Sequence, residues 1–154
     1  MSQDQKIFET IPVGSLGLVN LKSCQTLGSK VDKYLVDCRS KRQAKNAGTD
    51  AYLGYKQDSY VLDVSTPRFG SGEAKCVIKE SVRGKDLYLL VDVCNYSLTY
   101  TVCGHENHMS PDDHYADLKR VIAAVSGKAR RITVIMPFLY ESRQHKRSSR
   151  ESLD

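Results

Sequence analysis

Three apolar runs along the chain predict the strands of a parallel sheet. Residues 87–93 (LYLLVDV) are almost continuously apolar, which is typical of a parallel strand covered on both faces. Residues 16–21 form a shorter run, and residues 132–136 form another that ends at Pro137. We therefore expect a first strand, a central strand and a last, buried strand.

Two segments have apolar residues at helical spacing. The clearer one follows Ser110, a suitable N-cap, with Pro111 at the first helical position and Gly127 after the last turn. A second helix is predicted over residues 24–35, capped by Ser23. The clearer helix lies between two predicted strands, so the three elements form a βαβ unit with a right-handed crossover.

The remaining segments are predicted to be loops and one hairpin. Residues 59–64 and 73–80 have strand-like patterns and flank the turn sequence TPRFGSG at 66–72, which predicts an antiparallel pair. Residues 37–58 are polar and are interpreted as an inserted loop. Residues 95–110 are predicted to be a long surface loop.

These elements predict an α/β fold, a mostly parallel sheet flanked by helices with a small antiparallel hairpin. A chain of 154 residues suits one domain with a real core. A parallel sheet of this size usually continues. Residues 1–154 are therefore interpreted as the single N-terminal α/β domain of a longer two-domain protein.

Composition places the chain among ordinary globular proteins. It is 40% hydrophobic and 27% charged, which argues against disorder. No apolar run approaches the ~18 residues of a membrane helix, and the polar N-terminus does not resemble a signal peptide, so we expect a cytoplasmic protein. Its five cysteines form no CxxC pair and are expected to be reduced, mostly buried thiols.

The basic charge of the chain is concentrated near its end. The net charge is +5, and residues 143–150 carry Arg143, Lys146, Arg147 and Arg150 without any acid. A local cluster that follows a strand favours an anion site, because the ligands of α/β sheets lie beyond the carboxyl ends of the strands. RNA binding is the alternative, but the cluster lacks interleaved aromatic residues other than Tyr140. We expect a phosphate-bearing small molecule.

Other kinds of chemistry have weaker support in the sequence. Cys103, His105, His108 and His114 are possible zinc ligands, but the paired spacing of zinc modules is missing, so no metal site is predicted. There is no phosphate-binding loop of the form GxxxxGK[ST] and no GxSxG motif. The adjacent acids Asp112 and Asp113 are explained by their place in the first turn of a helix.

Several segments occur in an order that is specific as a set. They are residues 21–35 (LKSCQTLGSKVDKYL), 68–73 (RFGSGE), 79–86 (KESVRGKD) followed by LYLLVDV, the helix at 117–125, and 132–144 (ITVIMPFLYESRQ). Together they resemble the N-terminal half of ribose-phosphate pyrophosphokinase, also called phosphoribosyl pyrophosphate synthetase. The resemblance covers about residues 16–151 without the segment 37–58.

The resemblance implies a function in nucleotide biosynthesis. Enzymes of this family transfer the diphosphate of ATP to ribose 5-phosphate, with Mg²⁺, and so make phosphoribosyl pyrophosphate. They have phosphoribosyltransferase-like domains and form homo-oligomers, from dimers to hexamers. ATP, ribose 5-phosphate and copies of the same chain are therefore the expected partners, with no nucleic acid and no membrane.

The resemblance also assigns roles to residues of the glycine turn. Phe69 and Glu73 match the RFxDGE turn of the family, which holds the adenine of ATP, often across a subunit boundary. Ser71 lies in the same turn, where the family normally has aspartate, and is predicted to be an ATP-binding position.

Further roles are implied for the basic end of the chain and for one upstream arginine. Arg143 and Gln144 match the loop that contacts ATP, and His145 follows them where the family has aspartate. Arg83 matches an arginine that helps form a site for regulatory phosphate or ADP, and Arg150 falls near a second such position.

The catalytic residues of the family lie downstream of the matched segments. We therefore expect no catalytic residue within this fragment, and an isolated chain that is inactive. The alternative is a catalytically degenerate regulatory or structural subunit of the same family. The exchanges at Ser71 and His145 are of the kind that would accompany such a loss.

Overall fold

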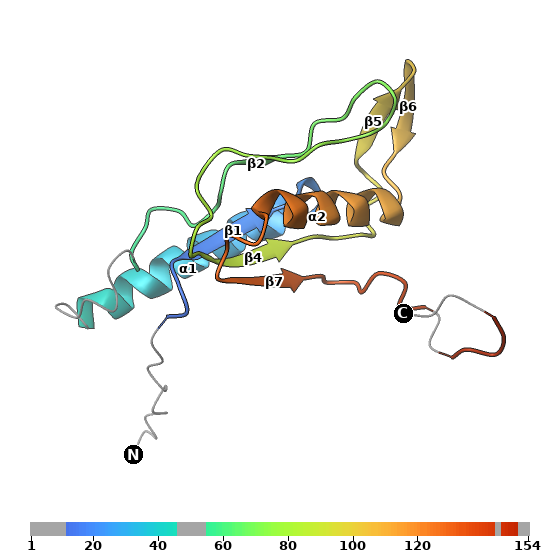
Figure 1. Cartoon of the computed structure of the whole chain (residues 1–154). Coiled ribbons are helices and arrows are strands. Elements are labelled where there is room, and N and C mark those ends of the chain that lie inside the picture. Colours follow the sequence, from blue (N-terminus) through green and yellow to red (C-terminus); the bar gives the residue numbers. More distant parts are fainter. Residues whose placement is uncertain (1–11, 46–54, 144–145, 151–154) are drawn as a thin grey trace.

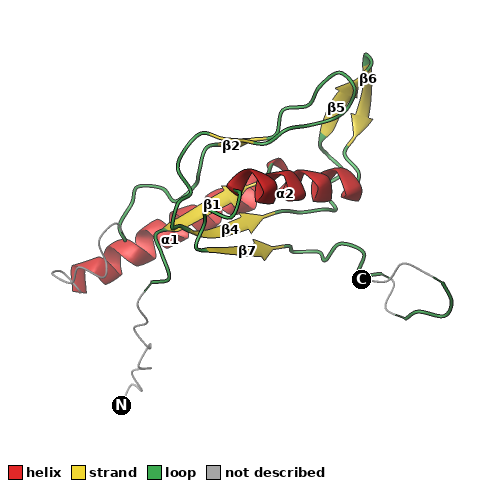
Figure 2. Cartoon of the chain, viewed as in Figure 1, coloured by secondary structure: helices red, strands yellow, loops and turns green. Residues whose placement is uncertain are grey.

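The structure is a computed structural model that describes residues 12–45, 55–143 and 146–150 (Figure 1). Two long helices lie on opposite sides of a small parallel sheet, and two short hairpins extend beyond it (Figure 2). The elements are β1 (Leu16–Asn20), a 3-10 turn η1 (Lys22–Cys24), α1 (Gln25–Lys45), β2 (Val64–Ser65), β3 (Val77–Ile78), β4 (Asp86–Leu90), β5 (Thr99–Val102), β6 (His105–His108), α2 (Pro111–Val125) and β7 (Arg131–Ile135).

The central sheet has the order β1-β4-β7, and both pairs are parallel. On one side of β4, Leu87 and Leu89 are both 0% exposed and lie in a cluster with Val121 of α2. On the other side, Leu90 lies in a cluster with Leu18, against which residues of α1 pack. The predicted central strand is therefore confirmed, because alternate side chains enter two different cores.

The last strand differs from the prediction of a buried strand. Val134 and Ile135 of β7 are 39% and 41% exposed. Among the described residues β7 pairs only with β4, so it is an edge strand with one open side. Its register is held at the first rung, where Arg131 donates to both carboxylate oxygens of Asp86 at 2.7 and 2.6 Å.

Helix α2 begins and ends where the sequence predicts. The Ser110 hydroxyl accepts from the Asp113 amide at 3.2 Å, and the Asp113 carboxylate accepts from the Ser110 amide at 2.9 Å. This is a capping box, with Pro111 as the first helical residue. Two left-handed residues, Ser126 and Gly127, with φ of 53° and 66°, stop the helix.

Helix α1 is longer than predicted and begins differently. The Ser23 hydroxyl does not cap it but accepts from the Asp92 amide at 3.1 Å, because a 3-10 turn precedes the helix. The helix also continues to residue 45, so the first part of segment 37–58 is not a loop, and residues 46–54 lie outside the described residues. The extension is supported by the Arg39 guanidinium, which lies over the rings of Tyr55 and Tyr60 at 4.2 and 4.9 Å.

The predicted pairing of segments 59–64 and 73–80 is confirmed, but it is short. Only Val64 and Ser65 pair with Ile78 and Val77 as β2 and β3. Residues 60–62 instead run parallel to β1, because the Leu18 amide donates to the carbonyl of residue 60 at 2.7 Å. Segment 59–64 therefore divides its hydrogen bonds between the sheet and the hairpin.

Residues 95–110 were predicted to be a loop, and this is wrong. They contain the antiparallel hairpin β5–β6, which turns at Cys103 and Gly104 with φ of 48° and 84°. Two left-handed residues match the twist of a two-residue hairpin, and Gly adopts that conformation without strain. Below the hairpin His114 is 2% exposed, and its Nε2 hydrogen-bonds to the Asn95 carbonyl at 2.8 Å.

Among the described residues no helix is long and apolar enough to cross a bilayer.

The two-sided core predicts a large loss of stability when β4 is truncated. Leu89→Ala is expected to lower the free energy of unfolding by about 2–5 kcal/mol, because Leu89 is fully buried. Ile122→Ala on α2, where the side chain is 39% exposed, serves as the control and is expected to cost less than about 1.5 kcal/mol. Urea unfolding of both variants measures the difference, and equal losses would contradict the assignment of β4 as the core strand.

Candidate functional site

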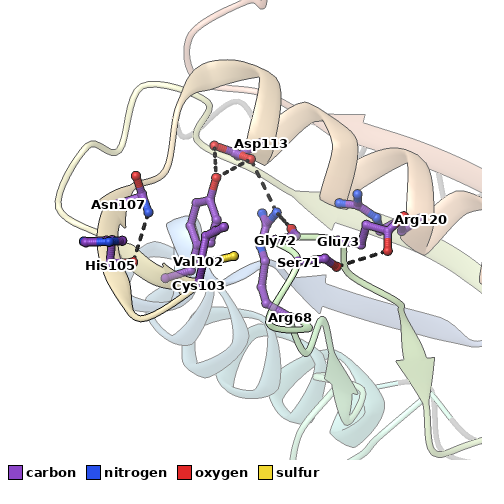
Figure 3. A pocket seen from close by; sticks show the side chains of 11 residues that line it. Arg68, Ser71, Gly72, Glu73, Val102, Cys103, His105, Asn107, Asp113 and Arg120 are labelled. Carbon is purple, nitrogen blue, oxygen red and sulfur yellow. Dashed lines mark hydrogen bonds and ion pairs between the residues drawn. The ribbon is translucent and has the colours of Figure 1, made fainter.

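One candidate site is an open cleft of about 770 Å³ between the glycine turn, the β5–β6 hairpin and α2 (Figure 3). The turn contributes Ser71 and Glu73, both of which the sequence predicts to bind ATP. The hairpin contributes a second wall, and Asp113 and Arg120 of α2 line a further side of the cleft. Segments far apart in the sequence therefore meet here.

Arg68 holds the three parts of the cleft together. Its guanidinium donates to the Gly72 carbonyl at 3.1 Å and pairs with Asp113 and Asp117, each at 3.4 Å. It also lies over the ring of Tyr100, 4.4 Å from the centroid. Only 11% of the Arg68 side chain is exposed, so its charge is compensated by these carboxylates rather than by water.

The glycine turn is closed by its own backbone and by the tip of the hairpin. The Phe69 amide donates to the Glu73 carbonyl at 2.7 Å, and the Cys103 amide donates to the Gly70 carbonyl at 3.0 Å. Gly72 has a φ of 90°, and a Cβ there would lie 3.0 Å from Val102. Glycine is required at this position both by the backbone conformation and by the close approach of the hairpin.

The side chains of the turn point outward or into the cleft. Phe69 is 50% exposed, so it does not fill the core below the hairpin, which was the alternative to a ligand contact. The Ser71 hydroxyl donates to the Glu73 carboxylate at 3.1 Å, and both residues are exposed. An aromatic face and a carboxylate are therefore presented on the same turn.

The charges of the cleft nearly cancel. Its lining contains two cations, Arg68 and Arg120, and two carboxylates, Glu73 and Asp113. Asp117 is buried behind them and pairs with Arg120 at 2.6 Å and with Arg68. Such a site does not attract a polyphosphate, but it suits an uncharged polar group such as a nucleobase or a ribose.

Asp113 stays ionised because its hydrogen bonds outweigh its burial. Burial raises the pKa of Asp113. Hydrogen bonds from the amide and hydroxyl of Ser110, the charge of Arg68 and the hydroxyl of Tyr100 lower the pKa by a larger amount. The net pKa is below the ordinary value of 3.8. The carboxylate that closes the capping box is thus the one that fixes Tyr100 and Arg68 in the cleft wall.

The basic loop lies in a different part of the molecule. Arg143 is exposed in the segment that follows β7, and Figure 1 shows this segment well away from the hairpin at the cleft. Gln144 and His145 lie outside the described residues. Tyr140 anchors the start of the loop to α2, because its ring stacks on Tyr115 at 4.2 Å and its hydroxyl donates to Asp112 at 2.5 Å, which raises the pKa of Tyr140 to about 12.

The two predicted regulatory arginines do not meet within the chain. Arg83 lies in the turn before β4, whereas Arg150 follows β7. Since β4 and β7 are parallel, these positions belong to opposite ends of the sheet. A second cleft of about 370 Å³ lies at the carboxyl end of the sheet and includes Lys30 of α1, Asp92 and Pro137, but not Arg143.

Metal and thiol chemistry receive no support from the geometry. Within the described part of the chain, no three His, Cys, Asp or Glu side chains are grouped as a metal site. All five cysteines are free, but the expectation that most are buried is wrong, since only Cys24 is buried while Cys94 and Cys103 are exposed. Burial raises the pKa of the Cys24 and Cys76 thiols, which disfavours their reactive thiolate forms.

Comparison with known proteins decides the family. The family model for the N-terminal domain of ribose phosphate pyrophosphokinase matches residues 16–154. The chain belongs to this family. Ribose-phosphate pyrophosphokinase 1 of Schizosaccharomyces pombe is 34% identical over 85 residues, which are 54% of this chain and 17% of that relative. The resemblance drawn from the sequence and the phosphoribosyltransferase-like α/β fold are thereby confirmed.

Several residues of the site in this ribose phosphate pyrophosphokinase domain were not predicted. Arg68 heads the RFGSGE segment but was assigned no role, and Asp113 was explained by the helix dipole alone. Asp113 and Asp117 are four residues apart and therefore lie on the same face of α2. This spacing could have indicated that the two carboxylates share one cationic partner. No comparable signal existed for Tyr100, because the hairpin that carries it was not predicted.

The depressed pKa of Asp113 predicts a specific pH dependence of stability. A carboxyl whose pKa is lower in the folded than in the unfolded chain contributes stability above its unfolded pKa, and this is lost as the pH falls through the folded pKa. Asp113→Asn is therefore expected to lower the free energy of unfolding near neutral pH. Below about pH 4 the variant should lose less stability with falling pH than the unaltered chain does. Urea midpoints from pH 7 to pH 2.5 measure this effect.

The control for this experiment is Asp63→Asn. Asp63 forms an exposed pair with Lys79, in which the two side chains are 58% and 59% exposed. Such pairs contribute little in the presence of salt, so the control should retain the pH profile of the unaltered chain. A profile for Asp113→Asn that parallels the control would show that Asp113 carries no such linkage.

Proposed function

We propose that this chain is the ATP-binding half of a ribose-phosphate pyrophosphokinase that makes phosphoribosyl pyrophosphate for nucleotide biosynthesis. Family membership supports the reaction class. The observation that carries the proposal is the glycine turn, which exposes Phe69 and directs Ser71 and Glu73 to a nearly neutral cleft. The proposed compartment is the cytoplasm, which suits a chain whose five cysteines are unpaired.

The cleft would receive the base of ATP. Phe69 does not line the cleft but is exposed on the same turn, where it offers an aromatic face for stacking beside the cleft, and the Glu73 carboxylate accepts a hydrogen bond from an N–H or O–H group of the nucleoside. Ser71 donates to Glu73 and so keeps that carboxylate in one orientation. This arrangement binds the end of the nucleotide that carries no charge.

The polyphosphate would be bound by the basic loop. Arg143 and the following Gln144, His145 and Lys146 supply donors and a net positive charge, whereas the charges of the cleft lining nearly cancel. The turn and the loop are separated within one chain (Figure 1). We therefore propose that a second copy of the chain completes each ATP site, in a homo-oligomer, and that Arg83 and Arg150 meet as a phosphate or ADP site across the same kind of boundary.

The reaction needs little covalent chemistry from the protein. The anomeric hydroxyl oxygen of ribose 5-phosphate forms a bond with the β-phosphorus of ATP, the bond from that phosphorus to the bridging oxygen of AMP breaks, and AMP leaves with the electron pair. The hydroxyl proton passes to a base. Mg²⁺ is proposed to enter with ATP as a complex. The role of this chain is positioning and charge stabilisation.

A second function, that of a degenerate regulatory subunit, is favoured by one observation. The Ser71 hydroxyl already donates a hydrogen bond to one oxygen of the Glu73 carboxylate, so that oxygen has less capacity to accept a hydrogen bond from a nucleotide. A titration of the full-length protein with Mg·ATP separates the two functions. Saturable binding supports the ATP-binding half, whereas its absence supports the degenerate subunit.

The proposed base contact predicts that Phe69→Ala weakens ATP binding. Stacking of a base on an aromatic side chain contributes about 1–3 kcal/mol, so the dissociation constant of Mg·ATP should rise about fivefold or more in the full-length protein. Tyr34→Ala, which removes an aromatic side chain that is 70% exposed on α1, should leave it unchanged. Calorimetric titration measures both, and an unchanged constant in Phe69→Ala excludes stacking at the turn.

A further prediction concerns the isolated 154-residue chain. Incubated with Mg·ATP and ribose 5-phosphate, it should form no phosphoribosyl pyrophosphate, because the residues assigned here bind and position ATP but none is placed as a catalytic group. Chromatographic detection of AMP and phosphoribosyl pyrophosphate tests this. Turnover by the isolated chain would show that catalytic groups lie within it.

A further inference from the structure

The β5–β6 hairpin presents two different faces. In its register Tyr100 lies opposite Asn107, and Val102 lies opposite His105. Facing residues of an antiparallel pair project to the same side, so these four side chains share one face, and all four line the cleft. The opposite face carries Thr99, Thr101, Glu106 and His108 and contributes nothing to the lining.

The two strands of the cleft-facing side are held differently. On β5, the Tyr100 hydroxyl donates to Asp113 and its ring packs under Arg68, so this strand is fixed to the body of the domain. On β6, Asn107 and His105 are exposed, and Asn107 Nδ2 donates only to the His105 carbonyl at 3.0 Å. Among the described residues, the amide oxygen of Asn107 has no hydrogen-bond partner, and it lies at a cleft wall built on a rigid support.

We propose that Asn107 is the specificity-determining residue that selects adenine, with His105 beside it at the edge of the cleft. This inference rests on the proposed function and adds the means of base selection. A side-chain amide offers one donor and one acceptor side by side, which matches the amine and the adjacent ring nitrogen of adenine. Guanine has a carbonyl in place of that amine, and the amide oxygen of Asn107, which is an acceptor, cannot form a hydrogen bond with it while Nδ2 is held by the His105 carbonyl.

The position of the hairpin supports this assignment. Figure 3 shows Asn107 and His105 on one side of Arg68, with Ser71 and Glu73 on the other. A cleft of about 770 Å³ between them is large enough for a nucleoside. The base would thus be contacted by the turn on one edge and by β6 on the other.

The test compares Mg·ATP with Mg·GTP as substrates or ligands of the full-length protein. Asn107→Ala and Asn107→Asp should each lower the preference for ATP over GTP, measured as the ratio of kcat/KM or of dissociation constants, by about fivefold or more. Thr101→Ala, on the opposite face of the same hairpin, should keep the ratio of the unaltered protein. Far-UV circular dichroism of all three variants checks that the hairpin and the domain remain folded.

The outcomes separate this inference from the function on which it rests. If Phe69→Ala weakens ATP binding while both Asn107 variants keep the base preference, the hairpin does not select the base and the inference is overturned. If the unaltered protein binds neither nucleotide, the proposed function fails and the inference fails with it. A loss of preference in Thr101→Ala equal to that in the Asn107 variants would also overturn it, because the effect would then belong to the hairpin as a whole.

Discussion

The pairing of Arg68 with two carboxylates of α2 is the interaction on which the candidate site depends. One guanidinium joins the glycine turn, the hairpin and the helix, through the Gly72 carbonyl, the Tyr100 ring and Asp113 with Asp117. An arginine suits this position because its planar fork of donors reaches several acceptors at once, which a lysine cannot do. Since the pair is largely buried, removing one partner would leave an uncompensated charge and disturb the whole cleft.

The separation of the two predicted ATP-binding segments follows from the same architecture. The turn is held against α2 and the hairpin, whereas the basic loop continues from β7 and is anchored by Tyr140 on Asp112 and Tyr115. Both attachments are to the first half of α2, but they lead away from the helix in different directions (Figure 1). Under the proposed function, each chain would therefore offer two halves of an ATP site, and an assembly of like chains would join them.

The parts of the fold that could be predicted are those in which local chemistry and tertiary packing agree. The run LYLLVDV and the capping sequence around Ser110 each favour one conformation, and the structure contains both the strand, which ends at Leu90, and the capped helix. The hairpin at 99–108 was missed because β6, HENH, has no apolar alternation and is exposed at every position, so only its pairing with β5 makes it a strand. The continuation of α1 beyond residue 37 likewise depends on Arg39 meeting Tyr55 and Tyr60, which lie later in the sequence.

The same distinction applies to the candidate site. Ser71 and Glu73 could be singled out because the segment RFGSGE resembles a local motif of the family, whereas Arg68 and Tyr100 act through contacts across 45 and 13 residues of sequence. No local pattern contains such contacts. The prediction that the last strand is buried was wrong for a related reason. The apolar run at 132–136 does not reveal that β7 has a neighbouring strand on one side only among the described residues.

The open side of β7 has a consequence for the behaviour of this domain by itself. Within the described chain, the outer row of backbone N–H and C=O groups of β7 faces no partner strand, and the side chains of Val134 and Ile135 are partly exposed to solvent. Exposed edges of this kind act as templates for sheet extension between molecules. The isolated domain is thus expected to self-associate at high concentration, and its colloidal stability should improve when a lysine or a proline is placed on that margin.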